Sequence, residues 1–457
     1  MIMLDAKQLR MERKELFEDL FDGIIPKRVP IMANLPIEFC MQYSNLPLAE
    51  TQWTLEGIEE ALDKACQMTS ADYYPSAFSR YPAHLQILGS RGFVMGSNGF
   101  IQHPEVTAMD ASEYDEFIKN PYDCLMEKVL PRLYPELNTD PIRRSIVFAK
   151  AFKAYYDYIE AYAKIDQKLI EKYGFHTVPR GTFAGATTPF DFISDFLRGF
   201  KEIALDIKRC PEKIIEACEA ALPLQIKKGM PPIPSKYGHT FIALHMGTYL
   251  RTKDFEKLYW PTFSKMVHAL AEAGQPSLIF CEHDWMRYLD YLQDLPENTR
   301  LYFEFGDPKL VKEKLGKKHI ISGFYPITYL KTATKEQCID KAKELIDILA
   351  PGGRYYFTFD KTPVTLDSIN VENYAAVLKY VVENSKYDNA GEKAASEKIS
   401  AKTPIKEEIP EFKSKYYMSW NDYKEIHSDI DPKLEPLMAA KLQTYEDMVF
   451  RMLALLV

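Results

Sequence analysis

Acidic and imidazole side chains stand together after one apolar run of the sequence. Glu282, His283 and Asp284 come after Leu278–Phe280, with only Cys281 between. Carboxylates and imidazoles can transfer protons at neutral pH, and both are ligands of zinc. Because alternate residues of a strand face opposite sides, the three side chains do not all point to one place. We expect Glu282 and His283 to act in catalysis, whereas Asp284 has the position of a residue that caps the next helix.

Two further candidate catalytic residues close other apolar runs. His245 follows Phe241–Leu244, and Asp360 follows the strand-like stretch 354–359. An imidazole in such a place can serve as an acid, a base or a ligand, and the alternative is a core histidine whose nitrogens are bonded. For Asp360 the alternative is a surface ion pair with Lys361.

Four polar or aromatic residues are candidates for binding a substrate. Asn34 ends the first predicted strand, and Tyr325 could stack on a ring. Arg80 and Arg180 could each hold a carboxylate or phosphate through two hydrogen bonds. A buried ion pair or a core aromatic is the alternative for each of these side chains.

Strands and helices alternate plainly from residue 239 onward, which predicts a parallel sheet with crossover helices. The predicted strands are 239–246, 277–283, 300–306, 319–325 and 354–360. Earlier strands that end at Asn34, Asp72 and Gly181 bring the total to eight. We therefore predict an α/β fold of the TIM type, a (β/α)₈ barrel, with an open doubly wound sheet as the alternative. In such a barrel the active site lies at the carboxyl ends of the strands.

The chain divides into four predicted parts. These are an N-terminal helical segment (1–25), the barrel (26–386) with a helical insertion at about 111–174, a polar linker (387–410) and a C-terminal helical extension (411–457). The extension is expected to dock on the barrel or on a second subunit, so a homo-oligomer is one expectation.

Composition narrows the classes of function. The 457 residues are 46% apolar and carry a net charge of −8, which suits a large core and argues against nucleic-acid binding. No apolar run is long enough to span a membrane, and the first residues lack the pattern of a signal peptide. The seven cysteines form no C-x-x-C pair, which argues against a disulfide framework. These features predict a cytoplasmic protein.

Several motifs resemble those of the uroporphyrinogen decarboxylase superfamily. Their order and spacing along about 25–385 carry the resemblance; they are Ala71-Asp72, the glycine-rich stretch Arg180–Phe190, the turn Asp206–Glu212, the block from His245 to Pro276, and Thr362-Pro363 with Glu372-Asn373. The resemblance implies a (β/α)₈ barrel. It also implies one of two chemistries, cofactor-free decarboxylation of a tetrapyrrole or zinc-dependent methyl transfer involving a corrinoid protein.

The chain departs from both patterns of that superfamily. The arginine-rich loop of the decarboxylases is replaced by Asn34–Tyr43, and their catalytic aspartate by Phe78-Ser79-Arg80. The methyltransferase ligands His-x-Cys are replaced by Phe280-Cys281-Glu282, and the last strand ends without a cysteine. Glu282, His283 and Asp360 are the side chains that remain to hold a divalent metal, zinc before others.

Three hypotheses follow. The first is a methyltransferase that moves a methyl group between a small molecule, an aromatic one in particular, and a corrinoid held by a partner protein. The second is a metal-free decarboxylase of a tetrapyrrole or another carboxylated substrate, with arginines as anchors and one acid as proton donor. The third is a non-catalytic binding or assembly protein that uses the 387–457 tail to dock a partner.

Overall fold

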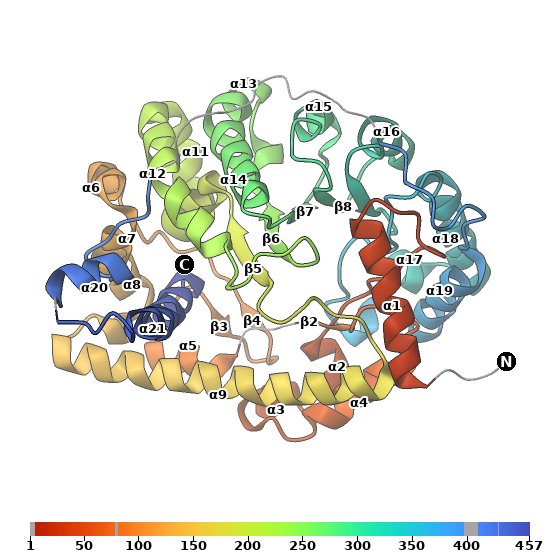
Figure 1. Cartoon of the computed structure of the whole chain (residues 1–457), viewed down its shortest axis with the longest axis horizontal. Coiled ribbons are helices and arrows are strands. Elements are labelled where there is room, and N and C mark those ends of the chain that lie inside the picture. Colours follow the sequence, from red (N-terminus) through yellow and green to blue (C-terminus); the bar gives the residue numbers. More distant parts are fainter. Residues whose placement is uncertain (1–4, 78–80, 397–409, 428) are drawn as a thin grey trace.

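A five-stranded parallel sheet forms the centre of the molecule (Figure 1). The computed structural model describes residues 5–77, 81–396, 410–427 and 429–457. The strands follow one another in chain order, β5 (Phe183–Thr187), β6 (His239–Leu244), β7 (Ser277–Cys281), β8 (Arg300–Phe303) and β9 (Ile320–Gly323). Four of them lie inside the strands predicted from residue 239 onward and are shorter by one to three residues at an end. The α/β fold with parallel strands is therefore confirmed.

Further parallel pairings continue beyond β9, and another joins the segment that precedes β5 to the chain around Tyr73. Residue pairs join segments far apart in the sequence, namely Ile321 with Tyr355, Tyr325 with Phe359, Ile31 with Phe357, and Tyr73 with His176. The short strands β1 (Leu35–Pro36) and β2 (Ser76–Ala77) also pair in parallel. The predicted strand 354–360 thus pairs with its neighbours through single bridges. On one side it pairs with β9, and on the other with Ile31, in the segment that precedes Asn34. A separate antiparallel hairpin joins β3 (Val94–Met95) to β4 (Ile101–Gln102).

Helices connect and surround these strands. Their bounds in the first half are α1 (Ala6–Phe21), α2 (Ile37–Tyr43), α3 (Leu48–Thr54), α4 (Ile58–Met68), α5 (Pro82–Leu88), α6 (Tyr114–Lys119), α7 (Pro121–Cys124), α8 (Leu130–Leu133), α9 (Pro141–Tyr173), α10 (Pro189–Asp191), α11 (Gly199–Arg209) and α12 (Pro211–Gly229). In the second half they are α13 (Thr252–Asp254), α14 (Trp260–Glu272), α15 (Leu289–Leu292), α16 (Pro308–Leu315), α17 (Tyr329–Thr332), α18 (Lys335–Leu349), α19 (Val371–Asn384), α20 (Trp420–Ile426) and α21 (Glu435–Leu455). Single turns of 3₁₀ or π geometry extend several of them.

The long helix α9 makes up half of the predicted insertion and runs along one side of the molecule (Figure 1). Its start is well specified, since the Asp140 side chain accepts hydrogen bonds from the first turn and Pro141 needs no backbone partner there. It ends at Gly174, which has a φ of +65° that suits glycine at a helix C-terminus. A Cβ at this glycine would lie 2.2 Å from the Ala6 carbonyl oxygen, so α1 packs directly on the end of α9.

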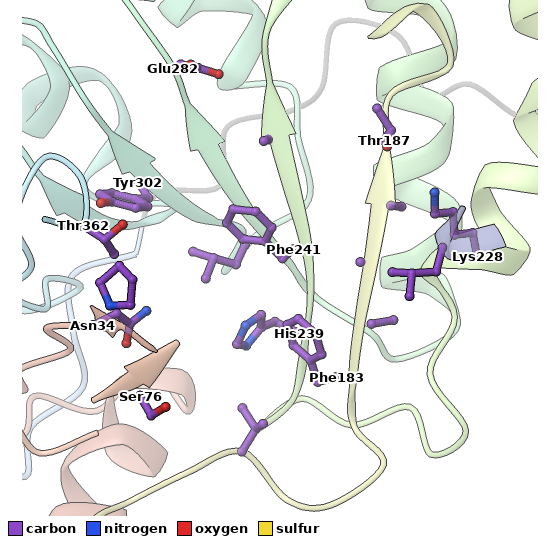
Figure 2. Close-up of a pocket in the computed structure, with 18 of the residues that line it drawn as sticks. Asn34, Ser76, Phe183, Thr187, Lys228, His239, Phe241, Glu282, Tyr302 and Thr362 are labelled. Carbon is purple, nitrogen blue, oxygen red and sulfur yellow. The ribbon is translucent and has the colours of Figure 1, made fainter. Parts of the chain in front are cut away.

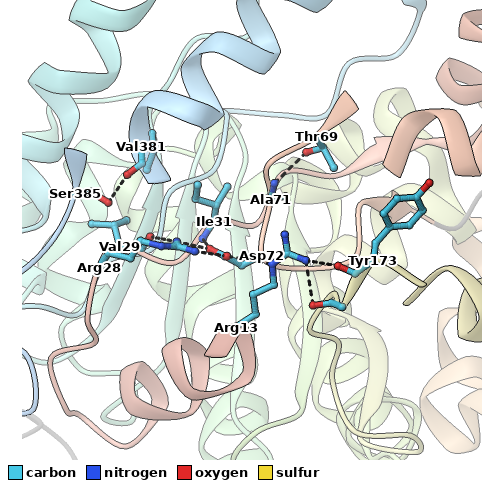
Figure 3. Close-up of polar contacts among 11 residues, drawn as sticks. Arg13, Arg28, Val29, Ile31, Thr69, Ala71, Asp72, Tyr173, Val381 and Ser385 are labelled. Carbon is cyan, nitrogen blue, oxygen red and sulfur yellow. Dashed lines mark hydrogen bonds and ion pairs between the residues drawn. The ribbon is translucent and has the colours of Figure 1, made fainter. Parts of the chain in front are cut away.

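A buried aspartate ties α1 to the first parallel segments (Figure 3). The carboxylate of Asp72 accepts hydrogen bonds from both terminal nitrogens of Arg28, at 2.7 and 2.5 Å, and from the backbone N–H of Ile31 at 2.9 Å. The Nε atom of Arg13, on α1, lies 3.6 Å from the same carboxylate. Arg13 also donates to the carbonyl oxygen of Tyr173 at 2.9 Å. The Asp72 carboxylate thereby contacts groups that lie 41 to 59 positions from it in the sequence.

The first part of the predicted linker is paired with the N-terminal segment. Ile24 and Arg28 form antiparallel bridges to Lys393 and Lys386, and the backbone N–H of Ala394 donates to Gly23. Residues 387–394 of the predicted linker therefore bond to the chain after α1 through their backbone groups. Residues 397–409 lie outside the described part.

The C-terminal extension packs on the molecule through its last helix. On α21, Phe450 and Met452 are buried, and the Lys227 ammonium of α12 lies 4.9 Å from the centre of the Phe450 ring. Tyr156 of α9 donates to the carbonyl oxygen of Met448 at 3.1 Å. All seven cysteines are free thiols. In the ranges that the structure describes, no helix has the length and apolar character that crossing a membrane requires.

Candidate active site

A large cavity of about 1380 Å³ lies among the parallel strands, α9 and the C-terminal segment (Figure 2). Its walls are mainly aromatic and aliphatic. The apolar lining includes Phe100, Tyr155, Tyr156, Phe183, Phe196, Phe241, Leu278, Tyr302, Tyr356, Phe359, Phe450, Met452 and Leu455. The polar lining includes Asn34, Glu38, Thr187, Asp195, Lys228, His239, His245, Glu282, Thr358, Lys361, Thr362 and Arg451. Cavities of this kind, apolar with a few polar groups, are typical of ligand sites.

Strand periodicity explains which residues reach the cavity. His239, Phe241, Ala243 and His245 alternate along β6 and its first following residue, and all four line the cavity. The residues between them face the other side, where Ile242 and Leu244 are fully buried. The strand therefore carries one histidine at its beginning and another just past its end. Six residues of extended strand separate them by about 20 Å.

His245 is held by an aspartate from a distant helix. Its Nδ1 atom lies 3.1 Å from Oδ2 of Asp195, which belongs to a stretch of π-helix after α10. This hydrogen bond is the main reason that the pKa of His245 rises to about 9, against the opposing effect of partial burial. The imidazole is therefore protonated at neutral pH. With 41% of its side chain exposed, it can donate a proton into the cavity.

A second aspartate fixes the backbone beneath His245. Asp191 is fully buried, and its carboxylate accepts from the backbone N–H groups of His245 and Met246 at 3.1 and 2.9 Å. The Tyr259 hydroxyl donates to it at 2.6 Å. Burial, together with the negative charge of nearby Asp195, raises the pKa of Asp191. The two carboxylates, four positions apart, thus have different roles. Asp191 fixes the backbone of His245 and Met246, and Asp195 orients the His245 imidazole.

His283 stands beside this pair in an unusual backbone conformation. Its φ of +63° is rare for a residue other than glycine and often marks a functional site. Its backbone N–H donates to Glu304 Oε2 at 2.8 Å, and its Nε2 atom lies 3.1 Å from the Tyr249 hydroxyl. The rings of His245 and His283 are 6.4 Å apart. The structure therefore brings these two predicted residues together.

Glu304 is a site residue that sequence reasoning missed. It follows β8 and forms a 2.5 Å ion pair with Lys361, which lines the cavity. Burial alone would raise the pKa of Glu304, but the bonds from Lys361 and from the His283 backbone lower it overall. The signal was present in the sequence, because Glu304 shares a strand face with Tyr302, a cavity residue, at a spacing of two.

Of the other predicted residues, two reach the cavity. Glu282 lies past the tip of β7, at the end of the cavity marked by Thr187, and Asn34 lines the cavity near Thr362 (Figure 2). Asp284 accepts from the backbone N–H of Met286 at 2.9 Å, as expected of a residue that caps a helical turn.

Asp360 and Tyr325 belong to the interior around the cavity and do not line it. The Asp360 carboxylate accepts from the backbone N–H of Ile327 at 2.8 Å, and burial raises its pKa to about 6. The Tyr325 hydroxyl donates to the carbonyl oxygen of Cys338, and its ring packs on Phe359. The structure thus places both residues beside the cavity, with one carboxylate oxygen of Asp360 and the hydroxyl of Tyr325 bonded to backbone groups.

Of the two predicted arginines, Arg180 lies away from this site. Arg180 is exposed in the turn before β5, at the amino end of the strand and away from Glu282. The sequence pattern alone could not distinguish an outward side chain at this position from an inward one. Arg80 lies outside the described residues.

The predicted metal ligands do not form a metal site. Within the described ranges, no three histidine, cysteine, aspartate or glutamate side chains gather closely enough to hold an ion. Glu282 faces the cavity, while Asp360 is bonded to Ile327 in the interior. The residues therefore do not fit zinc at Glu282, His283 and Asp360.

Comparison with known proteins does not place the chain in a group. No protein-family model matches the sequence, and no curated protein matches it. The interpretation of the cavity therefore depends on its geometry and on the residues that line it.

Proposed function

We propose that the chain is an enzyme in which His245, held by Asp195, is the proton donor to a substrate bound in the cavity. The observation that carries the proposal is the His245–Asp195 hydrogen bond of 3.1 Å at the end of β6. An imidazole that is protonated at neutral pH, partly exposed and oriented by a carboxylate meets the requirements of a general acid.

The architecture proposed for this enzyme is a (β/α)₈ barrel similar to that of the uroporphyrinogen decarboxylase superfamily. The parallel bridges from β9 through Tyr355, Phe357 and Ile31, and from Tyr73 to His176, support a ring of strands. The clustering of His245, His283 and Glu304 just past three adjacent strands is also what such a barrel predicts.

The reaction that we propose is methyl transfer from a small methylated molecule, an aromatic ether in particular, to a corrinoid held by a partner protein. When the bond between methyl carbon and oxygen breaks, the oxygen retains the electron pair. The imidazolium of His245 can protonate it, so that the departing group leaves as a neutral alcohol or phenol. The aromatic lining, including Phe241 and Tyr302, suits a flat apolar group.

Metal-free decarboxylation is the second candidate. The same proton would go to the carbanion left after loss of carbon dioxide, and two cations that line the cavity, His245 and Lys361, favour binding of a carboxylate. Arg180 has no part in this version because its side chain is exposed at the opposite strand end.

One experiment separates these candidates. Purified protein is incubated with methoxylated aromatic compounds and reduced corrinoid, and separately with aromatic and tetrapyrrole carboxylates, while methyl-corrinoid and carbon dioxide are measured. We expect methyl-corrinoid to form, and we expect His245→Gln to reduce its rate about 100-fold or more, the usual contribution of a general acid. His427→Gln, on the exposed C-terminal extension, is the matched control and should leave the rate unchanged.

The outcomes are distinct. Release of carbon dioxide without methyl-corrinoid favours the decarboxylase. A reaction that proceeds equally fast in His245→Gln contradicts the role of His245. If the protein turns over no compound of either series, the binding or assembly hypothesis replaces both.

A further inference from the structure

The second histidine of β6, His239, lies at the other end of the cavity. It is the first residue of the strand, its side chain is 6% exposed, and it lines the cavity about 20 Å from His245. Figure 2 shows its ring projecting from β6 near Phe183. No step of the proposed reaction uses this residue.

The proton of the His239 ring can be assigned from its partner. Nδ1 lies 3.1 Å from a terminal nitrogen of Arg300. A guanidinium only donates hydrogen bonds, so Nδ1 must be the acceptor and carry no proton. Burial, followed by the charge of Arg300, lowers the pKa of His239 to about 3, and the ring is neutral. The single proton is therefore on Nε2. Within the described residues, the one hydrogen bond of the His239 ring is the contact of Nδ1 with Arg300.

Arg300 is a buried cation without an acid beside it. Its guanidinium packs 3.5 Å from the centre of the Phe21 ring and donates to the Lys236 carbonyl oxygen at 2.8 Å. Among the described residues no carboxylate forms an ion pair with it, the charge effects on its pKa come from Tyr356 and Tyr73, and its Nε atom has no partner. Burial lowers its pKa to about 10, so the group keeps its charge at neutral pH. Buried charges are normally paired, and an unpaired one favours a nearby anion.

The surroundings of His239 on the cavity side are apolar. The Phe183 ring meets the imidazole edge-on at 5.4 Å, and Phe241, Leu278 and Tyr356 also line the cavity. The apolar body of a ligand bound here could contact Phe183, Phe241 and Leu278.

We propose that His239 and Arg300 form a second binding subsite, at the amino end of the strands, for the anionic oxygen of a ligand with an apolar body. The Nε2–H group donates to that oxygen, and Arg300 behind the ring supplies the compensating charge. An aromatic carboxylate is the simplest ligand of this class. A substrate that used this subsite and His245 together would be about 20 Å long.

Benzoate is the probe for this subsite, with benzyl alcohol and acetate as comparisons. Binding to the full chain is measured by NMR titration with ¹⁵N-labelled histidine, which also reports whether Nε2 is protonated and Nδ1 is not. We expect benzoate to bind at least about tenfold more tightly than either comparison. Benzyl alcohol lacks the charged acceptor and acetate lacks the apolar ring, and each of these contacts contributes about tenfold in affinity. The His239 Nε2 resonance should move as benzoate binds.

The variants His239→Phe and Arg300→Met should each weaken benzoate binding about tenfold or more. If either fails to fold, His239→Gln takes its place, because its amide can still donate to the ligand and should retain part of the affinity. His427→Gln, on the exposed C-terminal extension, should bind benzoate as the wild type does. The proposed reaction is tested separately, by methyl-corrinoid formation in His245→Gln, so failure of the subsite and failure of the reaction can be distinguished.

Three results would overturn the proposal. One is unchanged benzoate affinity in both His239→Phe and Arg300→Met. Another is equal affinity for acetate and benzoate, which would mean a simple anion site without an apolar requirement. The third is a titration in which Nδ1 of His239 is the protonated nitrogen.

Discussion

The hydrogen bond between His245 and Asp195 makes a quantitative prediction about proton availability. With a pKa of about 9, about 97% of His245 is protonated at pH 7.5, whereas at the ordinary value of 6.5 only about 9% would be. In Asp195→Asn the bond to a charged acceptor is lost. Partial burial still lowers the pKa of His245 and the charges of Asp191 and Glu282 still raise it, so the pKa should fall toward its ordinary value of 6.5. The fraction of His245 that is protonated at pH 7.5 should therefore fall by up to about tenfold.

The same shift in pKa affects stability. A rise of His245 from 6.5 to about 9 corresponds to about 3 kcal/mol for a fully buried group, and the 41% exposure of the side chain reduces this to about 1 kcal/mol. Because the folded-state pKa lies above the unfolded value, this stabilisation is fully present below about pH 6.5. It is lost as the pH rises through about 9.

The assay is an NMR titration of labelled histidine in wild type, in Asp195→Asn and in Asp290→Asn. His245→Gln identifies the resonance of interest. Asp290 forms a surface ion pair with Lys314 and should leave the titration of His245 unchanged. A wild-type midpoint near 6.5, or a midpoint that does not move in Asp195→Asn, would refute the reasoning from this hydrogen bond.

Three further predictions concern stability. Asp72→Asn leaves two buried arginines without a charged partner and should lower the free energy of unfolding, measured in urea, by about 3 kcal/mol. The surface variant Glu60→Gln is the control and should leave this free energy unchanged. An equal effect of the two variants would contradict the prediction. Gly323→Ala should lower the free energy of unfolding, measured by thermal unfolding, by about 3 kcal/mol or more. The reason is that Gly323 has a φ of +96° and that a Cβ there would lie 2.1 Å from the Phe303 carbonyl oxygen. A variant as stable as the wild type would show that β8 and β9 can separate there. Asp360 has a pKa of about 6, above its ordinary 3.8, so its neutral form stabilises the folded protein. As the pH rises from 4 to 8, the free energy of unfolding of the wild type should fall by up to about 3 kcal/mol from this group, and that of Asp360→Asn should not. Parallel pH profiles of stability for the two proteins would disprove this.

Local periodicity was enough to find the strands and several cavity residues. The alternation along β6 predicts that His245 shares a face with residues that line the cavity, and the same rule applied to β8 points to Glu304. Strand ends were predicted less well. At 282–284 the positive φ of His283 interrupts the alternation, so Glu282 and His283 both lie in the cluster although a regular strand would separate them.

Other residues could not be judged from the sequence because their surroundings come from distant segments. Tyr325 has the composition of a ligand-stacking residue, but Phe357 and Phe359 of the neighbouring strand enclose it. Asp195 precedes its partner His245 by 50 positions, and no spacing rule joins them. Arg300 begins an apolar strand, where its charge gives no indication that His239 is its partner.

The sequence by itself determined the α/β class, the parallel strands and the location of polar residues at the strand ends, because these depend on patterns within a few residues. The tertiary structure alone decided which polar atoms are already bonded and which remain available to a ligand. Asp360 and Tyr325 use their polar atoms on neighbouring backbone, while His245 and His239 face the cavity from opposite ends of one strand. The physical reason is that a side chain's pKa and free hydrogen-bonding capacity depend on groups that strand pairing brings together from far along the chain.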